Sequence, residues 1–298
     1  MSKTTKPNFI IIGAMKAATT SLHFYLKQHP NIFMPDVKEP MFFNSLKKNN
    51  YFIKGKQNKK ITSFEKYYAL FKNANEKAIG EASPGYIYNK YCADLIKKNL
   101  PDVKIIAVLR QPIERAYSNF LHVRRAGREP INDFFNTLDL EESRIQNNWS
   151  PVYHYIKQGY YHKQLLQYYN LFDQKDIKII LFDELVKNPK KIIKEIYYFL
   201  NVDPNFNTNT NKKLNVSGSP KGIFGWIIMK MRYYNLLQNV KPSKILPDFI
   251  INFISKLIYS KPQKLKRKEI IRLTKKYYVE DINKLEKLIN KKLDHWLS

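Results

Sequence analysis

Short runs of apolar, β-branched residues alternate with helical stretches through the first two thirds of the chain, and this alternation constrains the fold most. The clearest runs are 8–12, 77–81, 103–109 and 177–182. Continuous apolar runs of this length are typical of strands buried on both faces, and the helical stretches between them supply the crossovers that parallel strands need. The pattern therefore predicts an α/β fold with a doubly wound parallel sheet, flanking helices and a helical C-terminal elaboration.

The first apolar run leads directly into the loop Gly13-Ala14-Met15-Lys16-Ala17-Ala18-Thr19-Thr20-Ser21, which opens a helix predicted over 19–28. Backbone N–H groups at a helix N-terminus bind anions, a lysine adds positive charge, and hydroxyls add donors. The spacing differs from that of the nucleoside-triphosphate P-loop, in which Gly-Lys-Ser/Thr follows four free positions. The loop predicts a P-loop-like phosphate site; the alternative is an ordinary turn with a solvated lysine. The candidate donors are Lys16, Ala17, Ala18, Thr19, Thr20 and Ser21.

A second phosphate-type motif follows the apolar run 103–109. Arg110 comes at its end, Pro112 fits the first turn of a helix predicted over 112–125, and Ser118 lies about two turns along that helix. An arginine fork beside a hydroxyl suits a terminal phosphate. The alternative is that Arg110 and Arg115 are solvated or paired with a neighbour such as Glu114.

Together these motifs resemble those of the PAPS-dependent sulfotransferases, whose first strand ends in a Gly-x-x-Lys-x-Gly-Thr-Thr-like loop and whose 3′-phosphate site reads Arg-x-Pro-x-x-Arg-x-x-Ser. The resemblance covers about 9–202 and the C-terminal helix, and it is strongest to the carbohydrate and Golgi-like branch, in a bacterial form. Ala18 stands where the family often has glycine; alanine is tolerated poorly there if the position needs positive φ.

The same resemblance assigns the chemistry to the segment 37–43, which is similar to a Lys-Glu-x-x-Phe-Phe stretch in which the glutamate is the proposed general base. Glu39 would then take the proton of the attacking acceptor, and Lys38 would contact substrate. Apolar neighbours would disfavour the charged carboxylate, whereas Lys38 would favour it. The alternative is a surface carboxylate paired with Lys38. A histidine is the second choice of base.

Two further loops are assigned by resemblance. The stretch 80–86 is similar to one that lines the acceptor cleft, which places Ser83 and Tyr86 there; a turn with a packed tyrosine is the alternative. The stretch 215–222 is similar to a loop that closes over the donor, which gives Lys221 and Gly222 a phosphate contact; an exposed linker is the alternative.

Length predicts one domain over 1–298, and the resemblance implies that it is a sulfotransferase domain. It comprises a nucleotide-binding core (8–202), a cofactor and acceptor loop with an amphipathic elaboration (203–265) and a C-terminal helix (266–298). The elaboration either packs on the core or lies on an anionic membrane surface. Further helices are predicted over 63–71, 88–98, 131–144, 153–169, 189–200 and 272–297.

The composition limits the kinds of partner that we expect for this chain. Lysine and arginine number 52 against 25 acidic residues, which gives a net charge of +27. Such a charge attracts nucleic acid, anionic lipid or anionic polysaccharide. The alternative for part of this charge is a general richness in lysine that has no role in binding. The single Cys92 excludes an intramolecular disulfide and a cysteine-rich metal site. With no signal peptide or membrane span in the sequence, we expect a cytoplasmic protein, with peripheral contact to the inner membrane surface as an open alternative.

The resemblance implies transfer of a sulfuryl group from PAPS to a hydroxyl, or as second choice an amine, of a carbohydrate or lipid headgroup, giving 3′,5′-ADP without a metal. Two alternatives stay open: a P-loop-type kinase that uses ATP, and a basic nucleic-acid-binding protein. The first lacks the Gly-Lys-Ser/Thr order, and the second lacks a recognition motif. The acceptor and the oligomeric state are not defined by the sequence.

Overall fold

A five-stranded parallel sheet forms the centre of the molecule. The computed structural model describes residues 5–46, 52, 61–211, 219–220, 227, 231, 259–260 and 263–298. The strand order is β2-β3-β1-β4-β5, and all four pairings are parallel, which confirms the predicted α/β class. The strands are β1 (Phe9–Gly13), β2 (Ile32–Phe33), β3 (Ala78–Ala82), β4 (Lys104–Leu109) and β5 (Ile177–Leu181).

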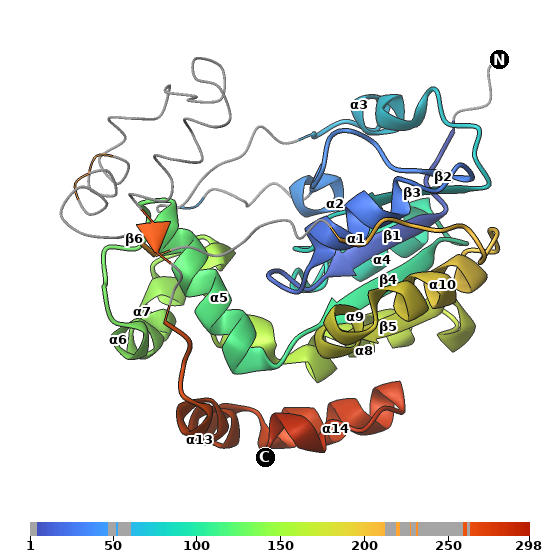
Figure 1. Cartoon of the computed structure of the whole chain (residues 1–298). Helices are drawn as coiled ribbons and strands as arrows, with labels where there is room; N and C mark the ends of the chain where they lie inside the picture. Colours follow the sequence, from blue (N-terminus) through green and yellow to red (C-terminus); the bar gives the residue numbers. More distant parts are fainter. Residues whose placement is uncertain are drawn as a thin grey trace.

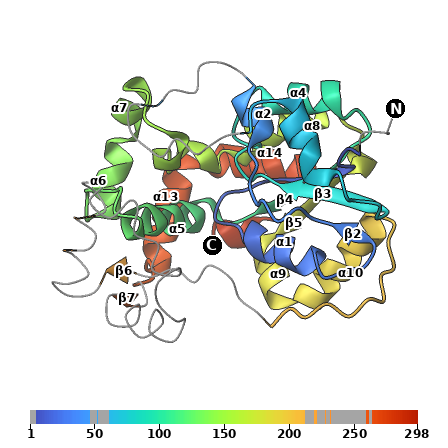
Figure 2. The same cartoon turned by 90° about the horizontal axis from the view of Figure 1, so that it is seen from above.

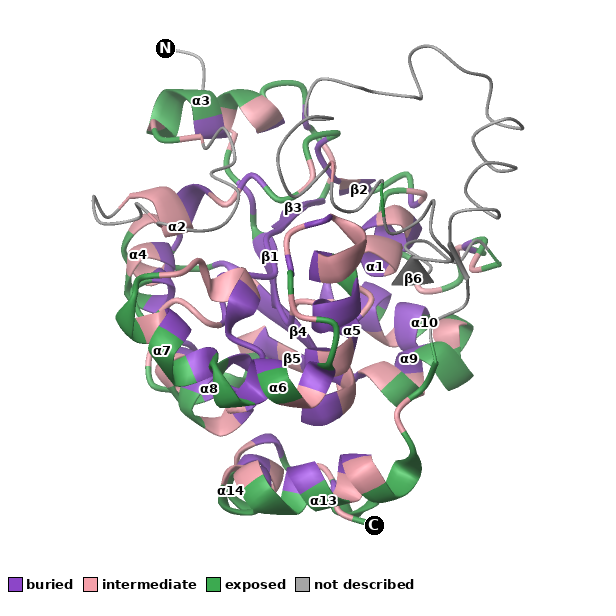
Figure 3. Cartoon of the chain, turned by 90° about the vertical axis from the view of Figure 1, so that its left-hand side faces the viewer, coloured by how far each residue is buried: buried purple, intermediate pink, exposed green. Residues whose placement is uncertain are grey.

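The central strands are continuous apolar runs because helices cover both of their faces. Every residue of β1 and β3 is buried, as are five of the six residues of β4. Figure 3 shows the buried residues gathered on the strands and on the inward sides of the helices. Phe9 pairs in register with Gly80, and its ring fills the space that a side chain at Gly80 would need.

The helices form two layers around the sheet (Figure 2). One layer contains α1 (Thr19–Leu26), α9 (Phe182–Lys187) and α10 (Pro189–Phe199), and the other contains α4 (Cys92–Asn99) and α8 (Tyr161–Tyr169). Helix α5 (Pro112–Arg125) leaves the carboxyl end of β4 and runs away from the sheet (Figure 1). Smaller elements are α2 (Phe42–Ser45), α3 (Phe64–Tyr68), the 3₁₀ turns 69–71 and 174–176, and the paired strands β6 (Ser219–Pro220) and β7 (Tyr259–Ser260).

The C-terminal region contains two helices, so the prediction of one helix over 272–297 is wrong. Helix α13 (Arg267–Tyr277) packs against α5, and α14 (Val279–Ile289) packs against α8. The helical conformation is interrupted at Tyr278, because its ring is fully buried and its hydroxyl donates to the carbonyl of Ile156 at 2.7 Å. Asn290, with φ 48°, ends α14, and a 3₁₀ turn (Asp294–Trp296) follows.

Three other predicted helices are shorter than expected. The stretch 88–98 is helical only from Cys92, where α4 begins. The stretch 131–144 contains α6 (Phe134–Asp139) and α7 (Glu141–Gln146), which runs past it by two residues. The stretch 153–169 is helical only in α8, preceded by the 3₁₀ turns 151–153 and 157–159. The reason is tertiary: the backbone N–H groups of Ile156 and Lys157 donate to the Glu141 carboxylate at 2.6 and 2.7 Å instead of to a helical turn.

The predicted elaboration lies mostly outside the described residues, and its role stays an expectation, as does the division at 202 and 265. Within the part of the chain that the structure describes, no helix has both the length and the apolar character needed to cross a membrane.

Candidate active site

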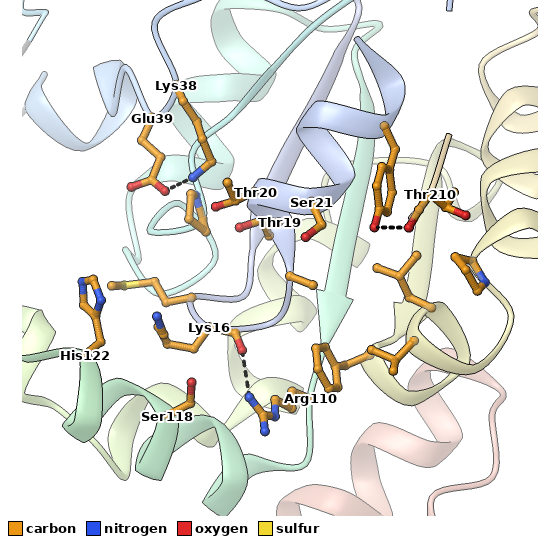
Figure 4. A pocket seen from close by; sticks show the side chains of 18 residues that line it. Lys16, Thr19, Thr20, Ser21, Lys38, Glu39, Arg110, Ser118, His122 and Thr210 are labelled. Carbon is orange, nitrogen blue, oxygen red and sulfur yellow. Dashed lines mark hydrogen bonds and ion pairs between the residues drawn. The ribbon is translucent and has the colours of Figure 1, made fainter. Parts of the chain in front are cut away.

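A cavity of about 690 Å³ opens at the carboxyl ends of β1 and β4, where ligands bind in doubly wound sheets (Figure 4). Its walls come from the loop before α1, the segment around Glu39, helix α5, and the start of α9 and α10. Nine of the residues predicted from the sequence line it: Lys16, Ala18, Thr19, Thr20, Ser21, Lys38, Glu39, Arg110 and Ser118.

The loop after β1 has two residues in the left-handed region of backbone conformation. Lys16 and Ala18 have φ values of 68° and 62°, so the position where related loops carry glycine does need positive φ, and Ala18 is strained there. Helix α1 begins at Thr19 without a capping side chain and without an acidic residue in its first turn. Thr19, Thr20 and Ser21 line the cavity, so the positive end of the helix faces it. Ala17 is fully buried behind the loop and does not line the cavity.

Lys16 is the cation at the centre of the loop. Burial, followed by the positive charge of Arg110, lowers the pKa of Lys16 to about 8, whereas the charge of Glu39 raises it. An anion bound beside Lys16 would raise this pKa again, because its negative charge stabilises the charged ammonium group that burial shields from solvent. The geometry thus favours an anionic ligand at this position.

Arg110, at the end of β4, is held among four partners. Its guanidinium pairs with Glu114 at 3.2 Å, donates to the carbonyl of Lys16 at 3.4 Å and lies 4.6 Å from the centre of the Phe182 ring. The hydroxyl of Tyr161 donates to the Arg110 carbonyl at 2.9 Å. The pairing with Glu114 is the alternative that the sequence left open, and Arg110 lines the cavity nonetheless.

Ser118 lines the cavity from α5, as the spacing predicted, whereas Arg115 does not. Arg115 is fully buried and donates to the carbonyl of Tyr155 and to the side chain of Gln158. It is neither solvated nor paired with Glu114, and it fixes the turns that precede α8.

Glu39 lies on the opposite wall of the cavity from Ser118, next to Lys38 (Figure 4). The two side chains form an ion pair, and the Glu39 side chain is 41% exposed. Its predicted apolar neighbours point elsewhere: the rings of Phe42 and Phe43 are buried and pack on Tyr67. The Glu39 carboxylate is therefore accessible from the cavity.

Ser83 and Tyr86 do not line the cavity, so their prediction as acceptor contacts is wrong. Both are fully buried. The Ser83 hydroxyl donates to Glu81 at 2.7 Å and accepts from the N–H of Met41 at 3.0 Å, and the Tyr86 hydroxyl accepts from the N–H of Phe43 at 3.4 Å. Pro84, between them, is the residue of this turn that reaches the cavity. Lys221 and Gly222 lie outside the described residues.

The sequence analysis missed His122 as a cavity residue, although it follows Ser118 by one helical turn. Loss of solvation and the positive charges of Lys16, Arg128 and Arg125 lower the pKa of His122 to about 4. His122 is exposed and lines the cavity, and we expect its imidazole to be neutral at pH 7.

The apolar part of the cavity was also missed. It includes Phe182, which directly follows β5. The position of Phe182 at the end of a third strand could have indicated that it lines the cavity. The other members of this part are Tyr25, Leu185, Val186 and Pro189, and Thr210, whose carbonyl accepts from the Tyr25 hydroxyl at 3.0 Å, lies beside them.

Comparison with known families identifies the family of the chain. The model of the Sulfotransferase family matches residues 7–206. The chain belongs to the sulfotransferase family. A solved sulfotransferase from Alicyclobacillus acidocaldarius superposes with a TM-score of 0.75 at 26% identity, covering 99% of this chain and 100% of that one.

Two curated relatives match parts of this sulfotransferase. The membrane-associated sulfotransferase kil1 of Dictyostelium discoideum is 36% identical over 143 residues, which is 47% of this chain and 28% of the relative. The mouse bifunctional heparan sulfate N-deacetylase/N-sulfotransferase 4 is 27% identical over 212 residues, or 67% of this chain and 23% of the relative. The matches thus span about a quarter of the length of each relative.

Proposed function

We propose that this sulfotransferase moves a sulfuryl group from PAPS to a hydroxyl of an acceptor, with an amine as the second choice, and releases 3′,5′-ADP. One observation carries the proposal: two anion-binding arrangements, Lys16 with the start of α1 and Arg110 with Ser118, open into the same cavity at the ends of adjacent strands. A donor with phosphates at its 5′ and 3′ positions has charges to match both.

The donor would lie along the wall formed by these two arrangements. Lys16, the amides of the loop and the hydroxyls of Thr19, Thr20 and Ser21 would hold the 5′-phosphosulfate. Arg110 and Ser118 would hold the 3′-phosphate, and the flat ring of Phe182 with the neighbouring apolar residues suits the adenine. Arg110 and Ser118 therefore distinguish PAPS from ATP.

The transfer needs a base and a stabiliser of charge. A new bond forms between the acceptor oxygen and sulfur as the bond from sulfur to the bridging phosphate oxygen breaks, and the acceptor proton goes to the Glu39 carboxylate. Lys16 and the loop amides stabilise the negative charge that develops on the bridging oxygen. These protein groups supply the countercharge, so the proposal includes no metal.

The acceptor we propose is a carbohydrate, either free or in a lipid headgroup. The mouse relative is named for heparan sulfate, and the Dictyostelium relative for its membrane association. Arg125 and Arg128 lie close enough to His122 to lower its pKa, so this side of the cavity is positively charged and suits an acidic sugar. Lys38, which lines the same cavity, would contact it.

Calorimetric titration with 3′,5′-ADP, with 5′-AMP and ATP as competitors, tests the donor site. We expect micromolar binding of 3′,5′-ADP and much weaker binding of 5′-AMP. Arg110→Ala should remove this preference, whereas Arg272→Ala, whose side chain stacks on Phe135 outside the cavity, should keep it. An Arg110→Ala variant with unchanged affinity for 3′,5′-ADP would refute the assignment of the 3′-phosphate site.

The family match favours sulfuryl transfer over the two alternatives from the sequence. Turnover of ATP that depends on Mg²⁺ would restore the kinase alternative, and salt-sensitive binding to DNA or RNA at physiological ionic strength would restore the nucleic-acid-binding one. Transfer of radiolabelled sulfate from PAPS to desulfated heparan oligosaccharides and to glycolipids tests the acceptor class directly.

A further inference from the structure

The segment that carries Glu39 has a backbone that its own residues do not favour. Glu39 and Met41 have φ values of 58° and 53°, in the left-handed region that costs a residue with a side chain about 1 kcal/mol or more. The only regular element it leads into is the single turn α2. Contacts from elsewhere in the fold must therefore hold the segment in place.

Three backbone N–H groups of this segment supply those contacts: one donates to the last residue of β3, and two donate to side chains of the turn that follows the strand. Glu39 donates to the carbonyl of Ala82 at 3.2 Å, Met41 to the Ser83 hydroxyl at 3.0 Å, and Phe43 to the Tyr86 hydroxyl at 3.4 Å. Every second residue of the segment thus donates its N–H group to the same stretch of chain. This spacing is that of a paired strand, except that side-chain oxygens take the place of two backbone carbonyls.

Glu81, the penultimate residue of β3, interacts with the hydroxyls of both Ser83 and Tyr86. It is fully buried, it does not line the cavity, and it accepts hydrogen bonds from Ser83 at 2.7 Å and from Tyr67 at 3.3 Å, with Tyr86 as a further partner. Burial raises the pKa of Glu81 to about 7, so at pH 8, where the variants below are compared, the carboxylate is ionised and only accepts hydrogen bonds. It therefore turns the protons of the Ser83 and Tyr86 hydroxyls toward itself and leaves their lone pairs for the N–H groups of Met41 and Phe43.

We propose that Glu81 is a positioning residue that, through Ser83 and Tyr86, fixes the backbone of 39–43 and so directs the Glu39 carboxylate into the cavity. The proposal rests on the proposed function in one respect, the role of Glu39 as base. It explains why a carboxylate, two tyrosines and a serine are buried together with no contact to the cavity. Burying a carboxylate is costly, and hydrogen bonds to it offset that cost only when the network is complete.

The test compares three conservative variants of this network at pH 8. Glu81→Gln removes the acceptor-only group, and Ser83→Ala removes the oxygen that holds Met41. Tyr67→Phe is the matched control, because it removes a buried hydrogen bond to the same carboxylate, but the Tyr67 hydroxyl accepts from none of the three N–H groups that hold the segment. Hydrogen exchange is the first readout: we expect about tenfold or faster exchange at Met41 and Phe43 in the first two variants, with β1 still protected.

Sulfate transfer from PAPS to desulfated heparan oligosaccharide is the second readout. We expect kcat to fall about tenfold or more in Glu81→Gln and Ser83→Ala, with the affinity for 3′,5′-ADP within about twofold of the parent, because the donor side of the cavity is untouched. In a Glu39→Gln background, Ser83→Ala should have no further effect on kcat, since the two act as a unit. Tyr67→Phe should stay within about threefold of the parent.

Exchange at Met41 and Phe43 that is unchanged in Ser83→Ala, or accelerated equally in Tyr67→Phe, would overturn the proposal. If Glu81→Gln does not fold, Ser83→Ala still decides. Failure of the proposed function has a different signature: the parent protein would not bind 3′,5′-ADP or transfer sulfate, while the exchange result would still stand.

Discussion

The lowered pKa of Lys16 makes donor binding depend on pH in a way that can be calculated. Burial and Arg110 lower this pKa to about 8, so the free protein carries a charged Lys16 below pH 8 and a neutral one above it. The donor phosphate requires the charged form, because only that form attracts an anion. Affinity is therefore present below pH 8 and is lost as the pH rises through 8.

The magnitude follows from the protonated fraction. For a pKa of about 8, this fraction falls from about 0.9 at pH 7 to about 0.1 at pH 9, which weakens binding about tenfold, or about 1.4 kcal/mol. Titration calorimetry with 3′,5′-ADP at pH 7, 8 and 9 measures the change. Glu39 opposes the shift, so Glu39→Gln should move the midpoint to lower pH.

Lys16→Arg is the control, because an arginine stays charged throughout this range. In that variant the affinity should be almost constant between pH 7 and pH 9, and any change that remains reports the ionisation of the ligand itself. A parent protein whose affinity does not change over this range, or an arginine variant with the same tenfold loss, would refute the assignment of the pH dependence to Lys16.

Three other predictions concern the donor side of the cavity. Ala18→Gly should raise the unfolding free energy by about 0.5–1 kcal/mol, because glycine removes the strain at φ 62°, and a lower melting temperature would contradict this. Glu114→Gln should strengthen binding of 3′,5′-ADP about threefold but leave 5′-AMP unchanged, because it frees Arg110 from its ion pair; calorimetry would contradict it if both ligands improved equally. Thr274→Val should reduce the preference for 3′,5′-ADP over 5′-AMP about threefold, because Gln111 donates to Thr274 at 2.6 Å and would lose a buried partner next to Arg110. An unchanged ratio of the two affinities would show that this contact does not position the arginine.

The sequence predicted the elements whose determinants are local. Strand β4 was predicted to within one residue because its apolar run is continuous, and α5 was predicted at both ends. Pro112 opens that helix at its first position, and Gly127, at φ 70°, takes the left-handed conformation just beyond its end. These signals lie within the element that they define.

The misplaced elements depend on partners far away in the chain. The backbone conformation before α8 is determined by hydrogen bonds with Glu141 and Tyr278, and not by the helical periodicity of its own sequence. For the same reason the hydroxyls of Ser83 and Tyr86 were assigned to the acceptor: a hydroxyl in a turn has the same sequence pattern whether it faces a ligand or a buried carboxylate. Lys16 and Arg110 were predicted correctly as residues at one site because each belongs to a motif contained within one strand end and the helix that follows it.

The neighbours of β1 in the sheet have a consequence for how proteins of this kind diversify. Strand β1 carries the donor loop, and it lies between β3, which holds the Glu39 segment, and β4, which ends in Arg110. In the function proposed above, the two substrates would therefore lie on opposite flanks of one strand. Changes near β3 would then alter the choice of acceptor without disturbing the donor, so related enzymes that modify different molecules could share one donor-binding half.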